Sequence, residues 1–162
     1  MVLTSCQLAS QDSAISASSD LSQTIPMLVS ASITPGKPNA DTEQIMLKRN
    51  NDHCVLIAVR SNPNRETIGQ FNTNVNCAVL NGLWRKVLDK KLLSFNLQIL
   101  EKEVFDFGVK SIQLEWSDKE FKTDSKTLSW TSPIVDEADL EFVFEELAIL
   151  VNAKAFELFY FN

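Results

Sequence analysis

Residues 111–131 alternate between apolar and polar side chains, and this pattern constrains the fold more than any other part of the chain. The apolar positions are Ile112, Leu114, Trp116, Leu128 and Trp130, and a polar run interrupted by Phe121 separates the two halves. A period of two predicts an antiparallel hairpin with one face against a core and the other in water. We expect Trp116 and Trp130 to pair across its two strands.

Other segments with strand character precede this hairpin. Residues 25–33 carry an apolar side chain at every second position, and residues 45–47 suggest a short second strand. Residues 54–59 are continuously apolar, which is typical of a central strand covered on both faces. Turn-forming clusters at 35–39, 50–52 and 61–64 separate these segments.

Two helices are predicted from spacings of three and four residues between apolar side chains. The first spans residues 82–93, follows a strand at 71–79, and has Asn81 as its expected N-cap. The second spans 133–151, with Ser132 as N-cap and Pro133 as first residue. Its expected core stripe is Leu140, Val143, Phe144, Leu147, Leu150 and Val151. Residues 155–161 predict a closing strand.

This order of elements predicts an α+β fold, in which two helices pack on one face of a mainly antiparallel sheet. We expect one domain over residues 25–162. A Ser-rich N-terminal arm, residues 1–24, precedes it; the arm has seven Ser and no Lys, Arg, Gly or Pro. Such a composition cannot bury enough apolar surface to order itself alone.

The net charge of −6 lies entirely in the last thirty residues, since residues 1–132 hold equal numbers of acidic and basic side chains. This acidic balance disfavours binding to nucleic acid or to anionic lipid, which both require clustered positive charge. No apolar run approaches the ~20 residues of a membrane-spanning helix. We therefore expect neither a nucleic-acid partner nor a membrane span.

Catalytic motifs are absent from the sequence. His53 is the single histidine, and its neighbour Cys54 would point to the opposite face of a strand. No zinc spacing, phosphate loop or nucleotide-binding fingerprint occurs, so we expect no metal and no cofactor. A small enzyme using His53 with a cysteine or a carboxylate is retained as an alternative function.

The three cysteines follow no recognisable spacing. Cys54 and Cys77 lie in apolar stretches, where we expect free thiols acting as small hydrophobic side chains. A reducing, cytoplasmic location follows from that expectation. As an alternative, the segment ending at Cys6 has the form of a bacterial lipoprotein cleavage box, so the protein would be membrane-tethered if the native gene extended upstream.

The second predicted helix carries apolar residues on the side away from its core stripe. Phe142 and Ile149 fall there, flanked by acidic side chains, and an apolar centre with a charged rim is typical of a protein interface. We expect this acidic helix to dock on a basic surface, within the fold or between copies. The predicted partner-binding residues are Phe142, Ile149, Glu141, Glu145 and Glu146, with Arg85, Lys86 and Lys90 on the first helix.

The sequence therefore favours a non-catalytic protein–protein interaction or assembly subunit, with a protein partner or a second copy of the chain as its ligand.

Overall fold

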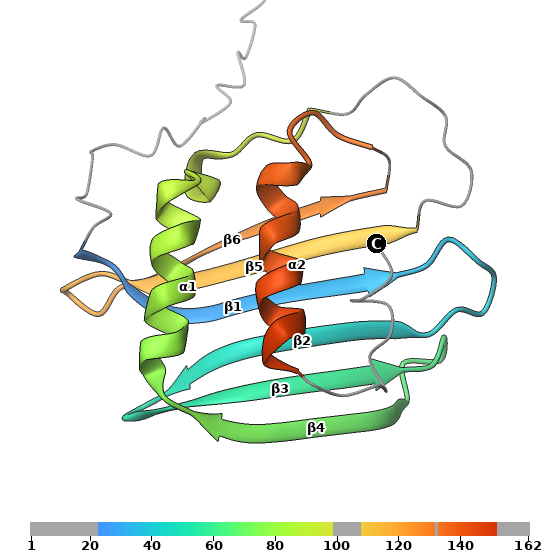
Figure 1. The fold of residues 1–162 in the computed structure, drawn as a ribbon, viewed down its shortest axis with the longest axis horizontal. Helices are drawn as coiled ribbons and strands as arrows, with labels where there is room; N and C mark the ends of the chain where they lie inside the picture. The colour runs from blue at the N-terminus through green and yellow to red at the C-terminus, as the bar shows by residue number, and fades with distance from the viewer. Residues whose placement is uncertain (1–22, 99–107, 132, 152–162) are drawn as a thin grey trace, which may run out of the picture.

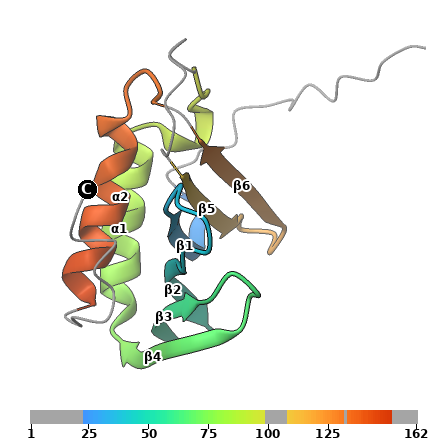
Figure 2. The ribbon, with the colours of Figure 1, turned by 90° about the vertical axis from the view of Figure 1, so that its right-hand side faces the viewer.

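The computed structural model describes residues 23–98, 108–131 and 133–151. It contains a six-stranded antiparallel sheet with two helices on one face, which confirms the predicted α+β class (Figures 1 and 2). The strands are β1 (Ile25–Thr34), β2 (Thr42–Asn50), β3 (His53–Ser61), β4 (Thr67–Val75), β5 (Val109–Ser117) and β6 (Thr123–Trp130). The helices are α1 (Cys77–Asp89), the short 3₁₀ turn η2 (Leu92–Ser94) and α2 (Ala138–Leu150).

The strand order is β4-β3-β2-β1-β5-β6, so the first strand in sequence lies inside the sheet. Strands β1 to β4 pair successively as a meander, and the β5–β6 hairpin adds to the other side of β1. Strands β4 and β6 form the two edges. None of the helices in the described ranges has both the length and the apolar character needed to cross a bilayer.

The core lies between the sheet and the two helices. The helix-facing side of the sheet contributes Val29, Ala31, Ile45, Leu47, Leu56, Ala58, Ile112, Leu114, Leu128 and Trp130. The helices contribute Leu80, Leu83, Trp84, Val87, Leu140, Val143, Phe144 and Leu147. Most of the stripe expected for the second helix is therefore buried. The expected arm and the expected closing strand lie largely or wholly outside the described residues.

Helix α1 begins five residues earlier than the sequence predicts. The preceding strand ends at Val75, and Asn76 has extended backbone angles while its side-chain oxygen accepts the N–H of Ala78 at 2.8 Å. Asn76 is therefore the N-cap, and the expected cap Asn81 lies inside the helix. Both asparagines suit a cap, and the end of strand pairing decides between them.

Helix α2 begins five residues later than predicted, at Ala138. Asp136 has a φ of 58°, which is left-handed backbone, so a right-handed helix cannot run through this position. The expected start at Pro133 is wrong for this reason. Residues 133–137 form a connection in which the N–H of Val135 bonds to the carbonyl of Gln98 at 2.8 Å.

The predicted hairpin exists, but its two tryptophans do not pair. Trp116 lies opposite Asp124, and Trp130 lies opposite Lys110. Their rings instead contact the helices, with centroid distances of 5.8 Å from Trp116 to Trp84 and 6.1 Å from Trp130 to Phe144. Alternation fixes which face a residue occupies, whereas the turn fixes the register.

Strand β3 is covered on one face, not on both. Leu56 and Ala58 are buried under the helices, while Val55, Ile57 and Val59 are half-buried on the opposite side of the sheet. Figure 2 shows both helices on one side of the sheet. The aliphatic run therefore crosses an open face whose other positions are mainly Ser, Thr, Asn and Gln.

Candidate functional site

The basic residues predicted on α1 meet acidic residues of α2 within the fold. Lys86 Nζ lies 2.6 Å from Glu146 Oε1, and Lys90 Nζ lies 2.7 Å from Asp139 Oδ1. These pairs are partly exposed, so each contributes little to stability on its own. Because these charges are paired within the chain, they attract another molecule to this part of the helix layer less strongly.

Glu141 faces the sheet rather than the solvent. Its Oε1 lies 2.5 Å from Nζ of Lys110 on β5, and the same ammonium lies 3.1 Å from Oε1 of Glu137. Burial raises the pKa of Glu137, but hydrogen bonds from Lys110 and Trp130 lower it by more, so the net shift is downward. The acidic start of α2 is thereby anchored to the sheet.

The other predicted partner-binding residues lie nearer the surface. Ile149 is 75% exposed, and Glu145, one helical turn before it, is also exposed. Arg85 is exposed on α1, whereas Phe142 is half-buried and packs against the core. The structure therefore separates the predicted set into residues used in internal ion pairs and residues left at the surface.

Cys54 and Cys77 form a disulfide that joins the start of β3 to the start of α1. The expectation of free thiols at these positions is wrong, and neither sulfur is a nucleophile in this state. The antiparallel pairing of β3 with β4 brings the two cysteines together, because it places Val75 opposite Cys54. His53 is exposed and has no hydrogen bond to a described side chain, and no metal-binding cluster occurs among the described residues.

Edge strand β4 is the most unusual surface feature of the sheet. Its nine residues, Thr67–Val75, include no charged residue and no proline. Nearly all of them are exposed, with Ile68 at 53% and Phe71 at 39%. Edge strands normally carry charges, prolines or coverings that prevent pairing with another chain. Sequence reasoning missed this site because edge position is a property of the sheet order.

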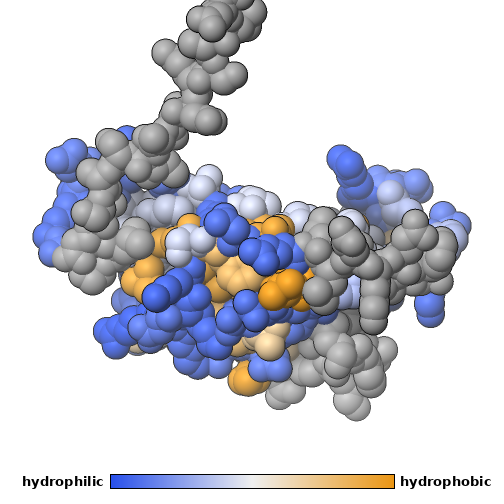
Figure 3. All heavy atoms as spheres, turned by 90° about the horizontal axis from the view of Figure 1, so that it is seen from above, coloured by the Kyte–Doolittle hydropathy of each residue, from blue (hydrophilic) through white to orange (hydrophobic). Residues whose placement is uncertain are grey.

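The opposite edge, β6, has such protection. It carries Asp124 and Lys126, and Lys126 Nζ donates to the carbonyls of Leu93 at 2.8 Å and Phe95 at 2.7 Å. Burial lowers the pKa of this ammonium. Figure 3 looks onto the molecule from this side and shows hydrophobic side chains near the centre, with hydrophilic side chains next to them.

The backbone of β4 is held firmly along most of its length. A register irregularity opposite Arg60 and Ser61 affects its first residues, and Gly69–Val75 then pairs regularly with β3. Val75 lies opposite Cys54, and the disulfide from Cys54 to Cys77, two residues after the strand, ties this end of β4 to β3. The seven residues from Gly69 onward therefore present a regular edge.

Comparison with protein-family models, curated protein sequences and solved structures finds no match to this chain.

Proposed function

We propose that this chain is a non-catalytic assembly protein whose copies associate through edge strand β4. The observation that carries the proposal is the exposed, regular and uncharged character of Gly69–Val75. An edge strand presents a row of backbone N–H and C=O groups, and strand addition by a second chain satisfies them. The two sheets would then form one continuous sheet.

The sequence of β4 suits pairing with itself. An antiparallel arrangement centred on Asn72 places Gln70 opposite Asn74 of the second copy and Phe71 opposite its Thr73. Gln70, Asn72 and Asn74 share the open face, where opposed amides can exchange hydrogen bonds. Because the chain has a net charge of −6, a neutral strip is where two copies meet with least repulsion.

A charge at the symmetry axis tests this arrangement. Asn72→Lys places two lysines opposite each other, so light scattering after gel filtration should show a dimer for the wild type and a monomer for the variant. Asn72→Glu should behave likewise, and mixing the two variants should restore a dimer because opposite charges then meet. Thr127→Lys, on the exposed side of β6, is the matched control and should remain dimeric.

Two results contradict the proposal. A wild-type chain that is monomeric at every concentration tested excludes self-association. A dimer that persists in both Asn72→Lys and Asn72→Glu places the contact elsewhere on the molecule.

The disulfide supports an oxidising compartment as the place where the protein works. The expected cytoplasmic location depended on free thiols at Cys54 and Cys77. Because these two cysteines are bonded to each other, that argument no longer holds. Thiol alkylation in acid-quenched native cells tests this. Modification of Cys6 alone supports an oxidising compartment, and modification of all three cysteines restores the cytoplasmic expectation.

A second contact, of the head-to-tail kind, is proposed between the outer side of α2 and α1 of another copy. The exposure of Ile149 beside Glu145 favours it, with Arg85 and the edge of Phe142 as further contacts. Such a contact would be the weaker of the two, and would extend dimers into larger species only at protein concentrations above those of the Asn72 test. Ile149→Glu should remove species larger than a dimer, and a wild type without such species contradicts this contact.

The remaining alternatives stay predictions. An enzyme using His53 would have to rely on a carboxylate, because Cys54 and Cys77 are bonded to each other. A lipoprotein anchored at Cys6 depends on residues outside the described range.

A further inference from the structure

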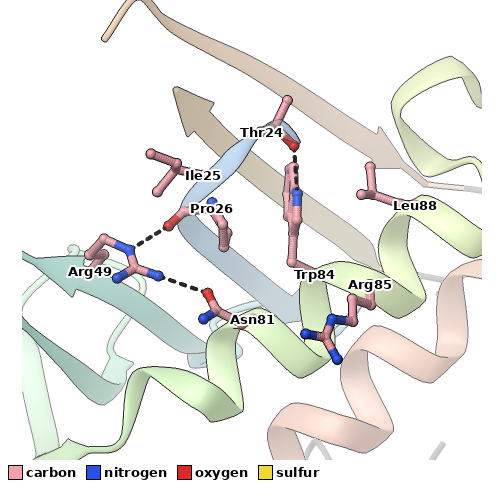
Figure 4. A pocket seen from close by; sticks show the side chains of 8 residues that line it. All are labelled: Thr24, Ile25, Pro26, Arg49, Asn81, Trp84, Arg85 and Leu88. Carbon is pink, nitrogen blue, oxygen red and sulfur yellow. Dashed lines mark hydrogen bonds between the residues drawn. The ribbon is translucent and has the colours of Figure 1, made fainter. Parts of the chain in front are cut away.

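A cavity of about 320 Å³ opens where the start of β1 meets α1. Its lining comes from three elements and the residue before β1: Thr24, Ile25 and Pro26, Arg49 of β2, and Asn81, Trp84, Arg85 and Leu88 of α1 (Figure 4). Small-molecule sites begin at about this volume. This cavity has no lining residue from β4, so a ligand bound there is independent of the proposed assembly.

The cavity is positively charged in an acidic protein. Two arginines line it, and no Asp or Glu is among its described lining residues, although the whole chain has a net charge of −6. A concave surface of one charge concentrates ions of the opposite charge. The lining therefore selects anions.

Arg49 is half-buried and is fixed by neutral acceptors. Its Nε donates to the carbonyl of Pro26 at 3.0 Å, and its Nη2 donates to Oδ1 of Asn81 at 2.8 Å. No carboxylate pairs with this guanidinium among the described residues, whereas partly buried cations are normally matched by an anion. These two bonds use two of its five N–H groups. Arg85 also lines the cavity, but its guanidinium lies well apart from that of Arg49, so Arg49 is the group that can receive an anion (Figure 4).

The remaining lining residues are apolar, or their polar atoms already take part in hydrogen bonds. Trp84 is almost fully buried, and its Nε1 donates to Oγ1 of Thr24 at 2.9 Å, so the ring orientation is fixed. Ile25, Pro26 and Leu88 provide aliphatic surface beside it. The cavity thus joins a cationic part to an apolar part.

We propose that this cavity binds a small organic carboxylate that carries an apolar body. A guanidinium binds a carboxylate through two parallel hydrogen bonds, which gives orientation as well as attraction. The apolar body would lie against Ile25 and Pro26, the apolar residues next to Arg49 (Figure 4). Inorganic anions could use the guanidinium groups but would leave the apolar surface unoccupied.

Benzoate and benzamide form a matched pair of probes, since they have the same shape and differ in charge. Nuclear magnetic resonance of the full chain, following the indole N–H of Trp84, should show saturable shifts with benzoate and none with benzamide at equal concentration. Inorganic phosphate should bind more weakly than benzoate. Arg49→Gln should weaken benzoate binding about tenfold, which is the contribution expected of a hydrogen bond to a charged group.

Arg49→Gln also removes the bond to Pro26, so the same spectra are used to check that the variant is folded. Arg49→Lys keeps the charge but cannot form two parallel hydrogen bonds, and should bind benzoate more weakly than the wild type and more tightly than Arg49→Gln. Arg65→Gln, in the β3–β4 loop, is the control and should bind benzoate like the wild type. Equal binding of benzamide, tighter binding of phosphate, an unaffected Arg49→Gln variant or no saturable shift would each overturn the proposal.

Discussion

Nζ of Lys110 lies 3.1 Å from Oε1 of Glu137, and this pair connects β5, the strand next to edge strand β6, to the start of α2. Trp130 Nε1 donates to the same carboxylate oxygen at 3.2 Å. The side chains of Lys110 and Glu137 are 14% and 21% exposed, and the two hydrogen bonds favour the charged form of the carboxylate. The pair is a point at which the fold responds to pH.

Acid should weaken the fold through Glu137. The pKa of its carboxyl is lowered from the ordinary value of 4.5, so the unfolded chain takes up a proton at higher pH than the folded one. The resulting stabilisation is complete above pH 4.5 and is lost as the pH falls through the lowered pKa. Urea unfolding measured across this range should show a shallower pH dependence in Glu137→Gln. The exposed Glu145→Gln is the control, and an unchanged slope in Glu137→Gln contradicts the expectation.

Loss of the disulfide should lower the free energy of unfolding by about 3 kcal/mol, because the bond closes a loop of moderate length in the unfolded chain. The two cysteines are 23 residues apart. Chemical denaturation of Cys54→Ser/Cys77→Ser against the wild type measures the difference, with Cys6→Ser as the control. Thiol titration of the unreduced, unfolded wild type should find one thiol per chain; three would show that the bond does not form.

Two glycines should respond to alanine in opposite directions. Gly82 lies inside α1 with no atom within 4 Å of an added Cβ, so Gly82→Ala should stabilise by about 0.5–1 kcal/mol through helix propensity. Gly108 has a φ of 76°, and its Cβ would overlap the carbonyl of Thr34 and lie 2.7 Å from the nitrogen of Gly36. Gly108→Ala should therefore cost at least about 2 kcal/mol. Thermal unfolding of both variants checks the sign, and equal effects would contradict the geometry.

Phe121, at the β5–β6 turn, is 83% exposed and has a φ of 61°. A bulky side chain in left-handed backbone is strained, whereas asparagine tolerates this conformation. Phe121→Asn should raise the free energy of unfolding by about 0.5–1 kcal/mol. As a control, Lys119→Asn introduces asparagine at another position of the turn and should have a smaller effect. A destabilised Phe121→Asn would show that the ring makes contacts that the exposure does not reveal.

Periodicity predicted the parts of this fold that depend on which face a residue occupies. The alternation from Ile112 to Trp130 predicted the hairpin, and the helical spacing from Leu140 to Leu147 predicted the buried side of α2. Periodicity did not predict the helix cap or the hairpin register, because these depend on neighbouring elements. Asn76 rather than Asn81 caps α1 because strand pairing ends at Val75. Trp116 and Trp130 lie apart because the turn sets the register.

The candidate sites were less predictable than the fold. The charges of Lys86, Lys90 and Glu146 suggested an interface, but a linear pattern does not show whether the opposite charge comes from the same chain. Strand β4 is a candidate because it is an edge strand, and it is an edge strand because β5 pairs with β1 and not with β4. The cavity gathers Pro26, Arg49 and Arg85 from three separate segments, and no local motif connects them.

The order of strands also determines when, during synthesis, β1 can gain its second partner strand. Strand β1 lies between β2, a near neighbour in sequence, and β5, which begins 75 residues after β1 ends, at Val109 against Thr34. Until β5 has been synthesised, one side of β1 has no partner strand, and Val29 and Ala31 lack part of their final packing. The β1–β5 contact is therefore expected to form late, and the nascent chain is most prone to aggregate just before it does.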